Sequence, residues 1–134
     1  MTPSAPLPSP SGAAPTEVLV VEDDSTVSAI VCMALEQAGY AVRSVDNCES
    51  AREAMQALTP AVLVMDLGLP DGNGLDILRD VIPQAEGGPA VVVLSGFRQE
   101  RNVLAAFEAG ANDFMVKPFS PHELVARVRR EVPA

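Results

Sequence analysis

The chain has 134 residues, 48% of them hydrophobic but only 4% aromatic, which predicts one domain with an aliphatic core. Its formal net charge of −9 argues against direct nucleic-acid binding by this segment, because such binding needs a basic stripe. No apolar run is long enough to span a membrane, and the N-terminal residues lack the basic and apolar regions of a signal peptide. The spacing of Cys32 and Cys48 does not match that of zinc ligands. We therefore expect a cytoplasmic protein with reduced thiols and no membrane contact.

The first segment, residues 1–15, is rich in Pro, Ser and Ala and has no charged side chain. It cannot bury enough apolar surface to offset the entropy of ordering, so we expect a disordered tail. The folded domain is expected over residues 16–132.

Five short apolar runs follow, without the polar alternation of a half-exposed strand. Such runs are typical of parallel strands that are buried on both faces. The predicted strands are Val18–Val21, Ala41–Val45, Ala61–Met65, Ala90–Leu94 and Phe114–Val116.

Stretches with helical spacing separate these runs. Their apolar positions are Val27, Ile30, Val31, Ala34 and Leu35, then Ala51, Ala54, Met55 and Leu58, then Leu75, Leu78 and Ile82, then Val103, Leu104 and Phe107, and finally Leu124, Val125, Val128 and Val132. Gly39 and Gly110 end the first and fourth helices. Ser120 and Glu123 form a capping box at the start of the last helix, with Pro121 at its first position.

Five strands alternating with five helices predict a single α/β domain with a doubly wound sheet and right-handed connections. We expect the flavodoxin-like strand order 2-1-3-4-5, because one reversal beside strand 1 suits this number of elements.

Polar side chains follow the predicted strands: Glu22, Asp23 and Asp24 after the first, Asp66 after the third, Ser95 after the fourth and Lys117 after the fifth, while Asp46 and Asn47 follow the second, farther from the expected crevice. Ligands of open α/β sheets bind beyond the carboxyl ends of the strands, so these groups should meet at one edge. A single aspartate there is often only a turn or capping residue. The combination, with Lys117 as the only lysine of an arginine-rich chain, favours a site that needs a compact charge.

Clustered carboxylates repel one another, and a divalent cation relieves that cost. Hard oxygen ligands in small number suit Mg²⁺ with several waters. Carboxylates, a hydroxyl and an ammonium around one metal predict a site for phosphoryl chemistry, with a carboxylate as nucleophile. No Walker loop is present, so a nucleoside triphosphate is not the expected ligand.

These residues lie in segments that resemble the receiver (CheY-like) domain of two-component response regulators, over about residues 17–132. The matching motifs are Val20–Asp23, Met65–Gly74, Leu94–Gly96 and Ala109–Phe119, in the order and at the spacing of the family. The resemblance implies that Asp66 accepts a phosphoryl group from a sensor histidine kinase and that the aspartyl phosphate switches the conformation to control an output domain or partner.

The resemblance also assigns the other site residues. It implies Mg²⁺ ligation by Asp23, Asp66 and the Gly68 backbone carbonyl, with Glu22 acting through a metal-bound water. Ser95 takes the hydroxyl position, Lys117 pairs with the carboxylate of Asp66 and then with the phosphate, and Phe114 matches the aromatic switch. The alternative for Phe114 is a plain core aromatic. Pro118 matches the proline whose preceding peptide bond is commonly cis in the family, and Asp24 is interpreted as a helix-start residue.

Two positions depart from the polar residues found in parts of the family. Gly68 and Phe97 cannot hydrogen-bond an attacking water through their side chains. We therefore expect slow self-dephosphorylation.

The last third resembles the winged-helix transcription-factor branch of the family. There Glu108, Asp113, Glu123, Arg127 and Arg129 would lie on the face of the fourth helix, fifth strand and fifth helix, and would pair across a two-fold homodimer. Val103 and Asn112 replace a cation and an acid of that branch, so ordinary solvated charges are the alternative.

Two other functions stay open at this point. An aspartate-nucleophile phosphohydrolase would need a general acid near the nucleophile, typically where Gly68 stands. A phosphorylation-independent interaction domain would not need the acidic pair, Asp66, Ser95 and Lys117 together. We favour a regulator that catalyses only its own phosphorylation and dephosphorylation; its kinase, signal and output are not evident from these residues.

Overall fold

The computed structural model describes residues 15–81, 88–96 and 100–132. Residues 1–14 of the expected tail, Ile82 of the third predicted helix and Phe97 lie outside the described residues.

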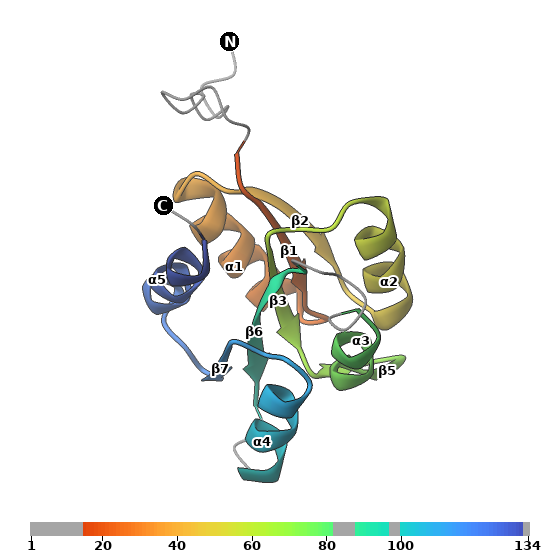
Figure 1. Ribbon diagram of the computed structural model, residues 1–134. Coiled ribbons are helices and arrows are strands. Elements are labelled where there is room, and N and C mark those ends of the chain that lie inside the picture. Colours follow the sequence, from red (N-terminus) through yellow and green to blue (C-terminus); the bar gives the residue numbers. More distant parts are fainter. Residues whose placement is uncertain (1–14, 82–87, 97–99, 133–134) are drawn as a thin grey trace.

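A five-stranded parallel sheet forms the centre of the fold (Figure 1). Its strands are β1 (Glu17–Val21), β2 (Ala41–Val45), β3 (Val62–Asp66), β6 (Ala90–Ser95) and β7 (Asp113–Val116). Their spatial order is β2-β1-β3-β6-β7, which confirms the predicted 2-1-3-4-5 arrangement. Val21 pairs in register with Met65, and Asp66 with Leu94, so the central strands end at nearly the same level.

Helices cover both faces of this sheet. They are α1 (Ser25–Gln37), α2 (Cys48–Ala57), α3 (Gly74–Val81), α4 (Glu100–Glu108) and α5 (Pro121–Glu131). Helices α1 and α5 lie together on one face, while α2 and α3 lie side by side on the other (Figure 1).

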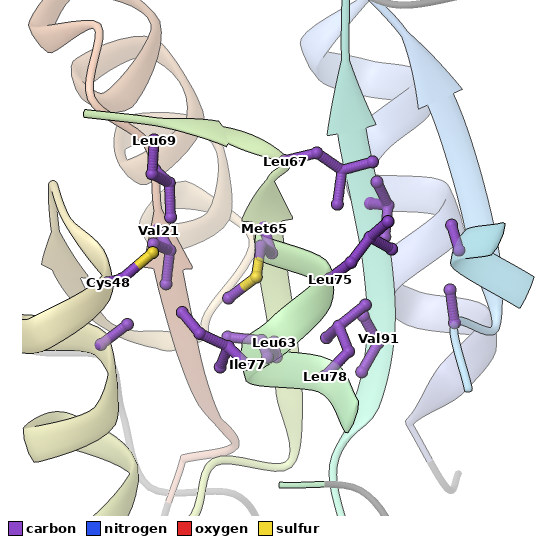
Figure 2. Packing of buried hydrophobic residues seen from close by; sticks show 14 of the residues in the cluster. Val21, Cys48, Leu63, Met65, Leu67, Leu69, Leu75, Ile77, Leu78 and Val91 are labelled. Atoms are coloured by element: carbon purple, nitrogen blue, oxygen red, sulfur yellow. The ribbon is translucent and has the colours of Figure 1, made fainter. Parts of the chain in front are cut away.

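Alternate residues of each strand supply two separate cores, as strands buried on both faces require. Val18 and Val20 of β1 pack in one cluster with Leu35 of α1 and Leu124 of α5. Leu19 and Val21 pack in the other, with α2, α3 and Ala106 of α4. Figure 2 shows this second cluster, in which Ile77 and Leu78 of α3 point toward Leu63 of β3.

Four large side chains with helical spacing are exposed rather than buried. Leu104 and Phe107 of α4 are 52% and 44% exposed, because the helix instead buries the small Ala106. Ile30 is 48% exposed, since α1 buries Val31 and Leu35. Leu58 is 49% exposed because α2 has already ended at Ala57.

Several helices begin or end at the capping residues and glycines that the sequence predicts. The carboxylate of Asp24 accepts hydrogen bonds from the N–H groups of Thr26 and Val27, which confirms its helix-start role at α1. The Ser120 hydroxyl accepts from the Glu123 N–H at the start of α5. Gly39 and Gly110 have φ angles of 101° and 110°, the left-handed region that glycine tolerates after a helix. None of the helices in the described ranges has the length and apolar content needed to cross a bilayer.

A small antiparallel hairpin, β4 (Gly68–Leu69) and β5 (Gly72–Asn73), lies between β3 and α3 and was not predicted. Behind it, α3 begins at Gly74, where an added Cβ would stand 2.8 Å from the Asp66 carbonyl oxygen and 2.9 Å from Met65 Sδ. Only glycine allows this approach, which places the hairpin directly beside the end of β3.

Candidate functional site

Three carboxylates meet at the carboxyl end of the sheet. Glu22 and Asp23 follow β1, and Asp66 is the last residue of β3; one oxygen from each lies within 4.8 Å of the others. Glu22 and Asp66 are buried, at 1% and 6% exposure, whereas Asp23 faces solvent. The cluster is therefore open on the side of Asp23, from which a hydrated cation or a phosphoryl donor can approach.

The ammonium of Lys117 contacts two of these carboxylates. Its Nζ lies 3.2 Å from Asp66 Oδ2, as expected, and 2.5 Å from Glu22 Oε1, which was not predicted. The Lys117 N–H donates to the Ser95 carbonyl at 2.8 Å, and the Lys117–Pro118 peptide bond is cis. The lysine side chain therefore reaches from the end of β7 to acids that follow β1 and end β3.

Burial dominates the electrostatics of Glu22. It raises the pKa of this carboxyl from 4.5 to about 7; Lys117 and the Asp24 N–H oppose the rise, and Asp66 adds to it. Burial alone would lower the pKa of Lys117, but Glu22 and Asp66 outweigh it, and the net direction is upward. The ammonium therefore stays charged between two acidic partners.

Both oxygens of Glu22 already have partners, since Oε2 accepts the Asp24 N–H at 3.1 Å and Oε1 meets Lys117. Both oxygens of Asp66 are also held, because Oδ1 accepts the Gly68 N–H at 3.1 Å and Oδ2 meets Lys117 Nζ at 3.2 Å. The exposed Asp23 is the most accessible of the three acids. The residues fit a divalent cation, because one hard oxygen donor from each of the three acids lies within 4.8 Å of the others.

Ser95 and Phe114 lie close to this edge but differ in surroundings. Ser95 ends β6 and is fully buried, with its register partner Val116 one residue before Lys117. Phe114 in β7 is half-buried and packs against the cluster of α2, α3 and α4. The Ser95 hydroxyl thus belongs to the same end of the sheet as the acids. Phe114 lies two residues before Val116 in β7 and is therefore farther from that end.

Some charged residues of the expected dimer face form ion pairs within the chain. Arg127 of α5 donates to Asp113 Oδ1 at 2.6 Å and to Glu123 Oε1 at 2.8 Å. These two bonds raise the pKa of Arg127, with the Glu123 contact the largest cause. Glu108 and Arg129 are exposed on α4 and α5.

The comparisons with known proteins all indicate the same family. A profile described as "Response regulator receiver domain" matches residues 18–129. The KDP operon transcriptional regulatory protein KdpE of Escherichia coli is 40% identical over 116 residues, covering 85% of this chain and 50% of that protein. The DNA-binding response regulator MtrA of Mycobacterium tuberculosis is 35% identical over 112 residues, covering 84% and 48%. The chain spans about half the length of the curated relatives it matches.

Solved structures agree with the sequence relatives. The BeF3-activated DrrB receiver domain superposes with a TM-score of 0.80 at 32% identity, over 88% of this chain and 97% of that one. DrrB of Thermotoga maritima is described as an OmpR/PhoB homologue, which agrees with the resemblance to the winged-helix branch. The chain belongs to the family of response regulator receiver domains, the phosphoacceptor domains of two-component signalling systems.

Proposed function

We propose that Asp66 is the residue that accepts the phosphoryl group, and that its donor is the phosphohistidine of a sensor histidine kinase. The observation that carries this proposal is the environment of the Asp66 carboxylate at the end of the central strand β3. Its Oδ2 meets the ammonium of Lys117 at 3.2 Å, and its Oδ1 accepts the Gly68 N–H at 3.1 Å. A carboxylate fixed in this way presents one orientation to an incoming phosphorus atom.

In the transfer step a carboxylate oxygen of Asp66 attacks phosphorus, so a carbon-bound oxygen gains the O–P bond while the N–P bond of the donor breaks. The electron pair of the N–P bond returns to the imidazole, which takes up a proton. Lys117 stabilises the charge that gathers on the phosphoryl oxygens, since its ammonium already lies against Asp66. Within this chain, the Asp66 carboxylate is the group that gains a covalent bond.

We propose Mg²⁺ as the cofactor, held by Asp23, Asp66 and the Gly68 carbonyl. When bound, the ion supplies charge neutralisation and alignment of the phosphoryl oxygens. We place Glu22 outside this set, because its carboxylate is buried and lies 2.5 Å from Lys117 Nζ, whereas Asp23 is exposed. Its carboxylate orients Lys117 and adds negative charge that favours a divalent ion.

The proposed switch uses Ser95 and Phe114. The phosphoryl group on Asp66 offers the Ser95 hydroxyl a new acceptor and so favours a different position of this side chain. The half-buried ring of Phe114 then moves toward the space that Ser95 leaves. Loss of signalling in Phe114→Ala with normal labelling of Asp66 would support this role, whereas loss of folding alone would favour a plain core aromatic.

We propose a cytoplasmic regulator rather than an enzyme acting on a separate substrate, and one with slow self-dephosphorylation. Gly68 has no side chain to act as a general acid or to orient water, which counts against a phosphohydrolase. A half-life of seconds for the purified phosphoprotein would contradict the slow reaction. Turnover of a small phosphomonoester would favour the enzyme.

Homodimerisation through α4, β7 and α5 is a further part of the proposal. Exposed Leu104 and Phe107 on α4 offer apolar area beside exposed Glu108. Arg127 would have to share Asp113 with a second chain or leave it, because the two already bind within one chain. Light scattering after size-exclusion chromatography, with and without the phosphate mimic beryllofluoride, tests this; a monomer in both conditions would contradict it.

The test of phosphorylation uses acetyl phosphate with Mg²⁺ and intact-mass spectrometry. The wild type should gain the mass of one phosphoryl group, and Asp66→Asn should gain none. Asp46→Asn, which neutralises an exposed aspartate, serves as the matched control and should be labelled normally. Equal labelling of wild type and Asp66→Asn would refute the assignment, as would no labelling of any of them.

A further inference from the structure

Asp71, in the turn of the β4–β5 hairpin, binds the start of a helix that is distant in sequence. Its Oδ1 accepts the Cys48 N–H at 2.7 Å, and its Oδ2 accepts the Glu49 N–H at 3.1 Å. The local cap of α2, Asn47, uses its own side chain on the Ser50 N–H at 2.8 Å. The free N–H groups at the start of α2 are thus shared between a local residue and the hairpin.

The same hairpin is tied to the phosphoacceptor at its other end. The Gly68 N–H binds Asp66 Oδ1, and Gly68 pairs in register with Asn73 across the hairpin. Behind it, the Gly74 N–H donates to the Leu67 carbonyl at 3.0 Å. Asp66, the hairpin and the first turn of α2 are therefore joined by one series of hydrogen bonds.

The hairpin has one apolar anchor. Leu69 is buried in the core cluster, but Gly68, Asp71, Gly72 and Asn73 are exposed. The two hydrogen bonds of Asp71 add a polar contact between the exposed turn of the hairpin and the start of α2. They also lower the pKa of Asp71, the Cys48 N–H being the largest cause, so this carboxylate is ionised at neutral pH.

The thiol of Cys48 lies beneath this contact. A Cβ placed on Gly72 would stand 3.2 Å from Cys48 Sγ, and Cys48 is only 8% exposed. Burial, with Asp71 as the second cause, raises the pKa of this thiol to about 11. Because the hairpin covers the sulfur, the reactivity of Cys48 reports whether the hairpin is in place.

We propose that Asp71 is a positioning residue for the phosphorylation site: by binding the start of α2 it holds the hairpin so that the Gly68 backbone stays beside Asp66. The part of this inference that concerns Mg²⁺ rests on the proposed role of the Gly68 carbonyl. An Asp71 that only capped α2 would affect stability and, through its charge, the pKa of the Cys48 thiol; Asp71→Asn and Asp71→Ala would then react alike at Cys48, because both remove the charge. An Asp71 that positions the hairpin must also affect metal binding, and the asparagine, which keeps an acceptor oxygen, must protect Cys48 better than the alanine.

The experiment compares Asp71→Ala, Asp71→Asn and the wild type as the full 134-residue chain. The asparagine keeps one acceptor oxygen and should rescue in part. Asp76→Asn is the matched control, because Asp76 is an exposed aspartate of α3 that pairs only locally with Arg79 at 3.5 Å. Urea unfolding confirms that each variant is folded; if the alanine variant is not, the asparagine variant carries the test.

Two measurements decide the outcome. Calorimetric titration should show Mg²⁺ affinity reduced roughly tenfold in Asp71→Ala, the size typical of residues that orient metal ligands. Alkylation by iodoacetamide, followed at each cysteine by peptide mass spectrometry, should be several-fold faster at Cys48 while Cys32 stays unchanged. Asp76→Asn should match the wild type in both.

Unchanged Mg²⁺ affinity with unchanged Cys48 reactivity would overturn the inference. Equal acceleration at Cys32 and Cys48 would also overturn it, because that pattern means general loosening of the fold. If the wild type itself binds no Mg²⁺, the proposed metal site fails instead; protection of Cys48 then decides alone whether Asp71 holds the hairpin.

Discussion

Replacing Glu22 with glutamine should make the metal-free protein more stable, and increasingly so as the pH rises. Burial raises the pKa of Glu22 from 4.5 to about 7. Below 4.5 the group is protonated in both the folded and the unfolded chain. As the pH rises toward 7 the unfolded chain loses this proton first, so the folded state loses stability until its own carboxyl has ionised. Glutamine keeps the shape of the side chain and cannot ionise.

The size of the effect follows from this pKa. The interval from 4.5 to about 7 sets a ceiling of about 3.4 kcal/mol at 1.36 kcal/mol per pH unit. This interval already includes the opposing effect of Lys117, and because the lysine side chain is 23% exposed, screening by water reduces the value further. We expect a gain in the free energy of unfolding of roughly 2 kcal/mol near pH 8 and almost none near pH 4.5. Little is lost at Lys117, because Asp66 remains 3.2 Å from its Nζ.

Urea unfolding in the presence of a chelator, followed by circular dichroism, measures this gain, since the chain has no tryptophan and one tyrosine. Glu53→Gln, on the exposed side of α2, is the control for removing one negative charge. Added Mg²⁺ should stabilise the wild type more than Glu22→Gln. A difference between the two proteins that does not change with pH, or that grows toward acid pH, would refute the reasoning.

Three other substitutions test separate features. Gly74→Ala should lower the free energy of unfolding by roughly 1–3 kcal/mol in urea titrations, because the added Cβ would stand 2.8 Å from a backbone oxygen at the end of β3; an unchanged midpoint would contradict this. Lys117→Arg should slow labelling by acetyl phosphate roughly 100-fold, since a planar guanidinium does not replace a compact ammonium between two carboxylates. A labelling rate equal to that of the wild type would show that only the charge matters. Arg127→Ala should cost about 1–2 kcal/mol in the same titrations, because it breaks the 2.6 Å bond to half-buried Asp113; a neutral effect would mean that solvent replaces the guanidinium.

The strand order could be predicted because the apolar runs carry it directly. Parallel strands buried on both faces leave no polar alternation, and each of the five runs became a strand of the sheet. The carboxyl ends of those strands then had to share one edge. This is why Glu22, Asp23, Asp66 and Lys117 were expected together, and the structure brings them together.

Contacts that depend on side-chain conformation or on very short elements could not be predicted. The pairing of Lys117 with Glu22 joins two residues that only the folded backbone brings to 2.5 Å. Two-residue strands such as β4 and β5 carry no periodicity, so the hairpin and the long-range cap by Asp71 were missed. In α4, three apolar residues fit more than one helical face, and packing against the sheet selected Ala106.

The charges of the site explain why a glutamate with a raised pKa suits the position beside Lys117. When all three carboxylates are ionised, they and the ammonium (−3 + 1) leave −2, which one divalent cation balances. On the proposed phosphorylation, the charge of Asp66 is replaced by that of a phosphoryl group of about −2, so the charges of the protein groups sum to about −3. The phosphoryl group and Glu22 then compete for the Lys117 ammonium. Glu22 can release Lys117 at little cost near neutral pH, because its carboxyl, with a pKa of about 7, takes up a proton when the ammonium leaves. Lys117 is then available to the phosphate, and the buried glutamate is left without a charge that needs a partner.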